Sequence, residues 1–238
     1  MSALYLIRHG QAGNRNDYDR LSELGHEQSQ LLGKYLATEG VQFSAMYCGE
    51  LRRQRETAAN VIEHMQFGGV GVPQLQIDPR WNEFDLGEVY SKIGPQIAAT
   101  NEKFSQEFAE MMATWDDPGA RFHRGHTDLD FAVVDAWIRD TFPFDGESFA
   151  TFTGRVQAAF MDLTKHAGDG HVAVFTSATP TGIAVATALE MPVVKSLRLA
   201  GVTYNASYST LRIQPHGFTL FSFNNIPHLE AQRLRTFR

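Results

Sequence analysis

The sequence predicts an α/β protein in which a mostly parallel sheet lies between two layers of helices, a three-layer α/β/α sandwich. Short apolar runs, typical of buried strands, alternate along the chain with segments whose apolar residues recur at helical spacing. Two alternating segments near the carboxyl end indicate a hairpin at the sheet edge. The 238 residues contain no internal repeat or low-complexity linker, so we predict a single domain over residues 1–238 with a helical insertion at about 90–145.

The first half of the chain is predicted to alternate strand and helix. Ser22 stands at the N-cap position of the first helix, whose end Gly40 marks. A second helix begins near Leu51 and ends before Gly68 and Gly69. Strands are expected at Ala3–Ile7, Phe43–Tyr47 and Val72–Ile77.

The second half opens with an irregular helical pattern from about Ile93 to Phe144, divided by a polar break at Asp116–Asp130. Beyond it we expect helices at Ser148–His166 and Pro180–Leu189, with Pro180 at or near a first turn. The remaining strands are expected at His171–Phe175, Tyr208–Ile213 and Phe218–Phe223.

Composition limits the classes of function. The net charge of −6 disfavours nucleic-acid binding, and no apolar stretch is long enough to span a membrane. The start lacks a basic segment and Arg8 interrupts its apolar run, so we do not expect a signal peptide. Cys48 is the single cysteine, which suits a reducing compartment. We therefore expect a soluble cytoplasmic protein; no metal site is predicted, because the His and carboxylate residues lack ligand spacing such as H-E-x-x-H.

Three segments carry residues that could take part in catalysis or ligand binding. His9 directly follows the first strand, where α/β sheets bind ligands, and it could be a nucleophile, a general base, a metal ligand or a loop histidine bonded to backbone. Gly10 would let backbone N–H groups approach an anion. The arginines at 52, 53 and 55 oppose a helix dipole; a solvated face accounts for one or two, and at least one is a candidate phosphate ligand. The segment Trp81–Glu88 places carboxylates among apolar residues, which fits either a general acid or a solvated acidic turn.

These segments together resemble the histidine phosphatase superfamily, also called the phosphoglycerate mutase-like family. The resemblance is carried by several blocks in order, namely Arg8-His9-Gly10-Gln11 with 21–28, Leu51–Ala58, Trp81–Glu88, and Gly146-Glu147-Ser148 with Arg155 and Val156. It implies the phosphoglycerate mutase-like fold and a metal-independent phosphomonoesterase without cofactor. In that pattern His9 is the nucleophile, Arg8 and Arg53 bind phosphate, and Glu83 protonates the leaving oxygen.

The sequence departs from the family at the second catalytic histidine, which normally follows a late buried strand. Ser177 occupies that position, and it can donate a hydrogen bond to a phosphoryl oxygen but supplies no positive charge. Three interpretations stay open: Ser177 is an auxiliary phosphate ligand in a slower phosphatase, His123 or His126 enters from the insertion acting as a lid, or the chain binds a phosphorylated ligand without turnover. Thr176, Ser177 and Thr179 could also cradle phosphate or cap the following helix.

The insertion and the tail allow further expectations. Aromatic and Met residues of the insertion recur at helical spacing, so packing is their default role, although they could also roof the pocket and favour a bulky or apolar phosphate ester. His228 is expected to be structural. A small phosphorylated substrate is the expected partner. The alternatives to a phosphatase are a ligand-binding member of the family and, with less support, a mutase-type phosphotransferase.

Overall fold

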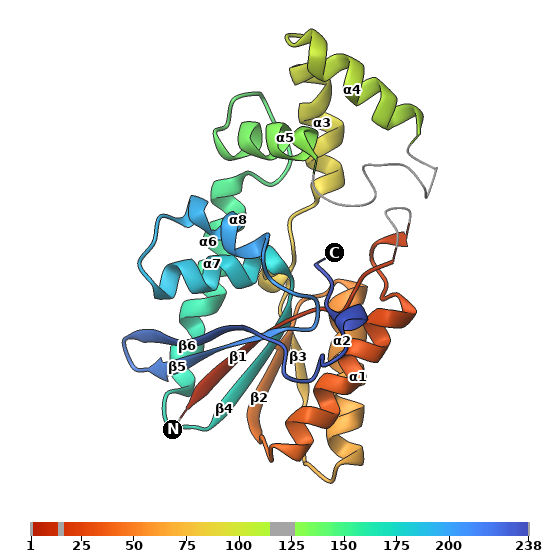
Figure 1. Ribbon diagram of the computed structural model, residues 1–238. Coiled ribbons are helices and arrows are strands. Elements are labelled where there is room, and N and C mark those ends of the chain that lie inside the picture. The colour runs from red at the N-terminus through yellow and green to blue at the C-terminus, as the bar shows by residue number, and fades with distance from the viewer. Residues whose placement is uncertain (1, 14–16, 115–126, 238) are drawn as a thin grey trace. The chain divides into compact units, whose positions relative to one another are not determined.

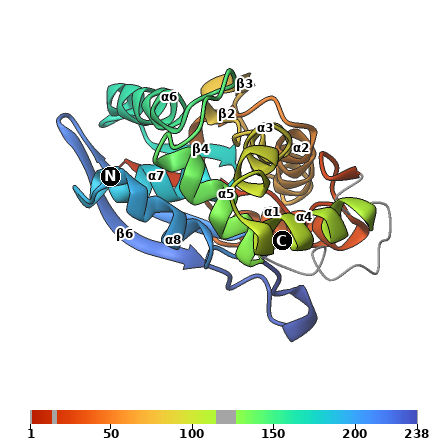
Figure 2. The ribbon, with the colours of Figure 1, turned by 90° about the horizontal axis from the view of Figure 1, so that it is seen from above.

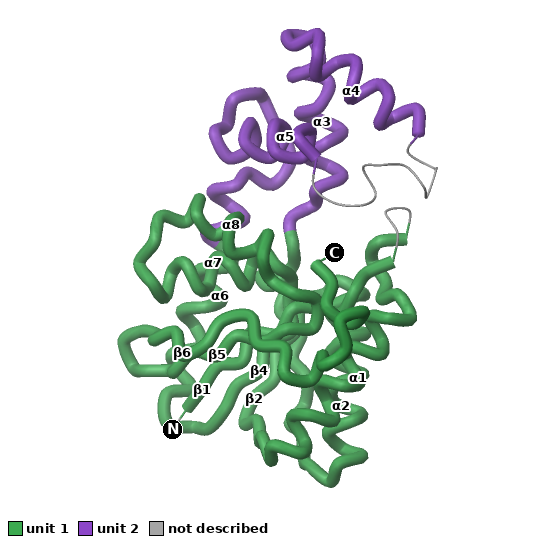
Figure 3. Tube along the Cα trace, viewed as in Figure 1, with its two compact units in different colours: residues 1–13, 17–83, 155–238 green, residues 14–16, 84–154 purple. Residues whose placement is uncertain are grey.

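The structure, a computed structural model, describes residues 2–13, 17–114 and 127–237 (Figure 1). The chain divides into two compact units (Figure 3). Unit 1 comprises residues 1–13, 17–83 and 155–238, and unit 2 comprises residues 14–16 and 84–154. The predicted insertion at about 90–145 lies within unit 2. His123 and His126, the two candidate lid histidines, lie outside the described residues.

Unit 1 is built on a six-stranded mixed sheet with the order β3-β2-β4-β1-β5-β6. The strands β1, β2, β3 and β4 pair in parallel, and β5 and β6 add an antiparallel hairpin beside β1. The predicted α/β class with a terminal hairpin at the edge is confirmed. The strands are β1 (Ala3–Arg8), β2 (Phe43–Cys48), β3 (Leu75–Ile77), β4 (His171–Thr176), β5 (Tyr208–Gln214) and β6 (Gly217–Asn225).

Helices α1 (Glu23–Thr38) and α2 (Arg52–Phe67) cover one face of the sheet, and α6 (Phe149–Asp162), α7 (Ala178–Ala188) and α8 (Ser196–Ala200) lie on the other side (Figure 2). The predicted cap is present, because the Ser22 hydroxyl accepts a hydrogen bond from the Gly25 N–H at 3.1 Å. Ile7 and Phe175 pack against apolar residues of α1 and α2 in a fully buried cluster. The aromatic rings of Phe160 and Phe218 stack on the other face with centroids 4.0 Å apart. These two cores make the three layers of the predicted sandwich.

Several element boundaries differ from the sequence prediction. The strand expected at Val72–Ile77 is only the three residues of β3, an edge strand whose neighbour on one side is β2. The helix expected at Ser148–His166 ends as α-helix at Asp162 and continues as a 3-10 turn, Leu163–His166. Helix α7 begins at Ala178, two residues before Pro180. Proline is compatible with this position because it lies in the first turn of the helix.

Unit 2 contains α3 (Leu86–Ala98), α4 (Glu102–Ala113), α5 (Asp128–Ile138) and the first turn and a half of α6. Several aromatic residues of unit 2 pack on one another: the rings of Phe84 and Trp137 stack with centroids 4.6 Å apart, and Phe104 stacks on Phe108, whereas Phe131 is 67% exposed. A reciprocal capping box between Thr127 and Asp130 starts α5. These contacts support packing, the default role expected for the aromatic residues.

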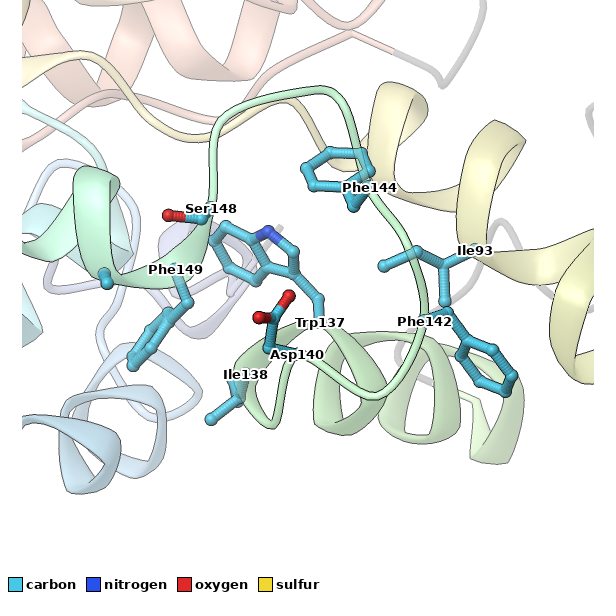
Figure 4. Close-up of a pocket in the computed structure, with 9 residues that line it drawn as sticks. Ile93, Trp137, Ile138, Asp140, Phe142, Phe144, Ser148 and Phe149 are labelled. Atoms are coloured by element: carbon cyan, nitrogen blue, oxygen red, sulfur yellow. The ribbon is translucent and has the colours of Figure 1, made fainter.

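A small cavity of about 110 Å³ lies at the end of α5 in unit 2 (Figure 4). Its lining includes Ile93, Trp137, Phe142, Phe144 and Phe149, and none of the sequence-predicted site residues belongs to it. In the parts of the chain that the structure describes, no helix combines the length and apolarity needed to cross a membrane.

His228 is buried in unit 1 beside the rings of Tyr35 and Tyr208, consistent with the structural role expected for it. Burial lowers the pKa of His228 from 6.5 to about 4. The unfolded chain therefore binds a proton near pH 6.5 that the folded chain binds only near pH 4, so folding stability falls as the pH decreases through that window.

We expect His228→Phe to remove this acid sensitivity. Between pH 7 and pH 4 the free energy of unfolding of the variant should fall by about 3 kcal/mol less than that of the parent, since each pKa unit corresponds to about 1.4 kcal/mol. Urea denaturation of both proteins at the two pH values measures the difference. If the free energy of unfolding fell equally in the two proteins between pH 7 and pH 4, His228 would not be the source of the acid sensitivity.

Candidate active site at the carboxyl ends of the central strands

The candidate nucleophile follows the central strand β1. Arg8 ends β1 and is in register with Thr176 at the end of the parallel neighbour β4, and the His9 N–H donates to the Thr176 carbonyl at 2.9 Å. His9 and Ser177 are therefore the first residues beyond two adjacent parallel strands. Both side chains are nearly fully buried, with 2% and 1% of their surface exposed. This is the edge where an open α/β sheet binds its ligands.

The imidazole of His9 is held in one tautomer. Its Nδ1 lies 2.7 Å from the Gly10 carbonyl, which can only accept, so Nδ1 carries the hydrogen and Nε2 keeps its lone pair. Burial lowers the pKa of His9 well below 6.5, and the positive charges of Arg53 and Arg8 lower it further. The side chain is thus a neutral imidazole with a nucleophilic Nε2, and its other nitrogen has the backbone carbonyl partner that a nucleophilic histidine needs.

Arg53 is the arginine of α2 that reaches this histidine. Its Nε donates toward His9 Nε2 at 3.3 Å, and only 6% of the residue is exposed, whereas Arg52 and Arg55 are exposed on the helix surface. Arg52 pairs with Glu56, as expected of the solvated face that the sequence allowed. The position that the family resemblance selected is therefore the one that contacts His9.

Two residues that the sequence analysis did not select hold Arg53 in place. Asp19 accepts from one terminal amino group of Arg53 at 2.9 Å, and the ring of Tyr18 lies 4.8 Å from the guanidinium carbon. The side chain of Asp19 is 54% exposed, so its ion pair with Arg53 is open to solvent. Charge alternation in Asp17–Arg20 was the only sequence signal, and it does not specify a partner 34 residues away.

We expect Asp19→Asn to tighten phosphate binding. Removal of one negative charge beside Arg53 should lower the inhibition constant of inorganic phosphate by about 3-fold, the effect of one charge at several ångströms in a largely aqueous setting. Competitive inhibition measurements on the variant, with Asp17→Asn as a control whose carboxylate pairs with Arg20, test this. Unchanged or weaker phosphate inhibition in Asp19→Asn would contradict the role.

Arg8 is buried and is held by the carboxyl-terminal part of the chain. Its terminal amino groups donate to the carbonyls of Thr203 and Phe237, and its Nε has no hydrogen-bond partner among the described residues. Burial lowers the pKa of Arg8, and the nearby charge of Glu83 opposes that shift. The positive charge of Arg8 lowers the pKa of His9. Among the described residues, the Nε–H of Arg8 has no acceptor and is therefore available to donate to a ligand.

Glu83, the candidate acid, lies at the amino end of α7. Its Oε2 accepts from the Thr179 N–H at 3.1 Å, so the carboxyl group satisfies a backbone donor in the first turn of that helix. Arg155 fixes the preceding turn, because one of its amino groups donates to the carbonyls of Arg80 and Asn82 at 2.9 and 2.8 Å. The predicted acid thus lies on a segment anchored to α6 and α7.

The polar groups of Gly10 and Ser177 have partners within the protein. The Gly10 N–H donates to the Thr57 hydroxyl at 3.0 Å, and Gly10 is required because a Cβ there would lie 2.4 Å from the Gly25 carbonyl oxygen. Ser177 is the N-cap residue of α7, but its side chain makes no capping hydrogen bond, so the capping role allowed by the sequence is wrong for this residue. Its hydroxyl instead accepts from the Gln54 amide at 2.8 Å. Gln54 was not selected from the sequence, because it stands among arginines on α2.

Comparison with known proteins identifies the family. The model of the histidine phosphatase superfamily (branch 1) matches residues 4–132 and 123–226. The chain belongs to this superfamily. The adenosylcobalamin/alpha-ribazole phosphatase of Escherichia coli is 25% identical over 227 residues, which cover 88% of this chain and 94% of that protein. The solved structure of YhfR from Bacillus stearothermophilus has a TM-score of 0.65 at 21% identity, with 97% of this chain and 100% of that chain covered.

A shorter but more similar match is the serine/threonine-protein phosphatase Pgam5, mitochondrial, of Caenorhabditis briggsae. It is 40% identical over 62 residues, which are 26% of this chain and 22% of that protein, so this chain matches about a fifth of the length of that relative. Both of these sequence relatives are phosphatases by name. A 2,3-bisphosphoglycerate-dependent phosphoglycerate mutase of Methylorubrum populi is also similar, with 32% identity over 95 residues. Within the described residues, no group of three or more His, Cys, Asp or Glu side chains is arranged to hold a metal ion.

Proposed function

We propose that the chain is a phosphomonoesterase that forms a phosphohistidine on His9. The observation that carries this proposal is the geometry of the imidazole: Nδ1 is bound to the Gly10 carbonyl, and the free Nε2 lies 3.3 Å from the Nε of Arg53. A neutral, buried and correctly oriented nucleophile beside a guanidinium is what in-line attack on a phosphate ester requires.

In the first step Nε2 of His9 attacks phosphorus and the bond from phosphorus to the ester oxygen breaks. Glu83, in its protonated form, donates a proton to the departing oxygen, and the guanidinium groups of Arg8 and Arg53 stabilise the charge on the transferred group. In the second step water attacks phosphorus, Glu83 accepts a proton from that water, and the P–N bond breaks. Inorganic phosphate leaves, and His9 and Glu83 return to their starting protonation states.

The direct test is to trap the intermediate. Rapid acid-free denaturation during turnover of a ³²P-labelled phosphate monoester should yield labelled protein whose label is lost in acid and retained in base, as expected for a phosphorus–nitrogen bond. A panel of esters with small, aromatic and long apolar alcohols supplies the substrates. If no ester is hydrolysed and no protein is labelled, the proposal is wrong.

We propose a small phosphate monoester as the substrate, with a bulky or apolar alcohol as its leaving group. Tyr18 supports this extension, since its ring lies over the guanidinium of Arg53 and is 36% exposed. Aromatic esters should therefore show a higher kcat/KM than esters of small sugars. Equal values would remove the apolar preference and leave the phosphatase proposal intact.

We also propose that catalysis is metal-independent and that the protein is cytoplasmic. Metal independence is supported by the two buried arginines, which can supply the positive charge that a cation would otherwise give; activity should persist in excess EDTA. The location is supported by cysteine usage: Cys48 is the single cysteine and is free, so the chain has no internal disulfide of the kind common in oxidising compartments.

A second candidate, a phosphate-ligand binder without turnover, is favoured by Ser177 in the position of the second histidine. Such a binder would gain thermal stability with phosphate or vanadate and would show no hydrolysis even after Ser177→His. Because Gln54 fills the space beside Ser177, the histidine should be introduced together with Gln54→Ala. Increased hydrolysis in that double variant would identify a working phosphatase site.

A further inference from the structure

Gln54 occupies an unusual place for an uncharged amide. It is fully buried on α2 directly after Arg53, and both hydrogens of its amide are used: one donates to the Trp81 carbonyl at 3.2 Å and the other to the Ser177 hydroxyl at 2.8 Å. Because a carbonyl only accepts, the contact with Trp81 fixes which end of the amide is nitrogen. The direction of the bond to Ser177 follows from this orientation.

The Ser177 oxygen is therefore an acceptor, and its own hydrogen is not used by Gln54. In the described part of the chain, the Ser177 hydroxyl donates to no protein group. Its oxygen also makes no capping hydrogen bond to the backbone of α7. A hydroxyl that is 1% exposed and lies one residue beyond β4, next to His9, has a donor to offer at the site. A buried donor without an acceptor costs free energy, which a bound phosphoryl oxygen would recover.

We propose that Gln54 is a positioning residue: it holds the Ser177 oxygen so that the hydroxyl hydrogen points to the phosphoryl group transferred to His9. The inference rests on the proposed phosphatase function and deepens it, because it assigns the oriented donor that takes the place of the second histidine. Neither an amide nor a hydroxyl titrates in the physiological range. This donor therefore stays intact at alkaline pH, whereas an imidazolium would lose its charge.

The test uses kinetics of four single variants, one of them a control, and one double variant. Ser177→Ala removes the donor and should lower kcat about 10- to 100-fold. Gln54→Met keeps the side-chain length but cannot hold the hydroxyl, and it should lower kcat about 10-fold with little change in KM. In the double variant, which combines Ser177→Ala with Gln54→Met, kcat should be no lower than in Ser177→Ala alone, because Gln54 acts only through Ser177.

Gln54→Glu separates positioning from packing. An ionised carboxylate accepts a hydrogen bond, so Ser177 would turn its hydrogen toward Glu and away from phosphate, whereas the protonated acid can donate as the amide does. We expect the ratio of kcat in this variant to kcat in the parent, measured at the same pH, to approach 1 at acidic pH and to fall about 10-fold at higher pH. Gln157→Met, which removes a comparable amide–hydroxyl contact with Thr187, is the matched control and should leave kcat unchanged.

The outcomes distinguish the inference from the function beneath it. If the parent forms no phosphoenzyme, the proposed function fails and the inference fails with it. If the parent is active but Gln54→Met has parental kcat, or its effect multiplies with that of Ser177→Ala, Gln54 does not position Ser177. A loss in Gln54→Glu that is the same at every pH likewise overturns the inference and leaves a packing role.

Discussion

Replacement of His9 by asparagine is expected to abolish the phosphoenzyme and to lower kcat by at least about 10⁴-fold, as for other enzymes that lose their nucleophile. The asparagine amide can still donate to the Gly10 carbonyl that now binds Nδ1, so the local backbone should persist. What the variant lacks is the lone pair on Nε2. Steady-state kinetics and ³²P labelling of the same preparation measure both losses.

His216→Asn is the matched control for this prediction, because His216 lies in the exposed turn between β5 and β6. The control should keep parental kcat and labelling. Vanadate should still raise the Tm of His9→Asn, since Arg8 and Arg53 remain to bind the anion. More than about 1% of parental kcat in His9→Asn would mean that another group attacks phosphorus.

Arg53→Met is expected to lower kcat/KM by about 10³-fold, the size seen when a single donor or arginine that stabilises the transferred phosphoryl group is lost. The guanidinium contacts His9 and carries a charge that lowers the pKa of His9. Its loss should therefore also raise the pKa of His9, so activity should begin to fall at a higher pH on acidification than in the parent.

Arg52→Met is the control beside it on the same helix, since Arg52 is exposed and pairs with Glu56. That variant should change kcat/KM by less than about 2-fold, the scale of a surface ion pair. Arg53→Lys should lie between parent and Arg53→Met, because lysine keeps the charge but loses the planar fork. Equal kcat/KM in Arg52→Met and Arg53→Met would refute a special role for Arg53.

Periodicity predicted the fold of unit 1 well because most of its elements bury one face of a layered core. The sequence of strand and helix through β1, α1, β2 and α2, and the hairpin of β5 and β6, follow directly from such patterns. Helix α3 was harder to predict: Gly87 and Pro95 lie within it, and both residues usually mark breaks. The short β3 was overestimated because Val72 packs on the core without pairing in the sheet.

The site was predicted where a local motif coincides with a strand end, as at His9, or where blocks of a known family single out one residue, as at Arg53. The partners that orient these groups left no such trace. Gln54 and Ser177 are 123 residues apart, and Arg155 meets the turn before Glu83 from 73 residues away. A pairing of two polar side chains across the layers has no period in the sequence, so it became visible only with the fold.

The carbonyl of Trp81 accepts from both Gln54 and Thr176, while its indole is completely enclosed in the apolar interior. Trp81 thus serves the packed interior with its side chain and, with its carbonyl oxygen, holds two side chains beside the candidate site. Any substitution that lets this indole settle differently would carry Glu83, two positions along, with it. Core redesign aimed at higher thermostability should therefore keep Trp81, because a substitution there would change both the stability of the protein and its activity.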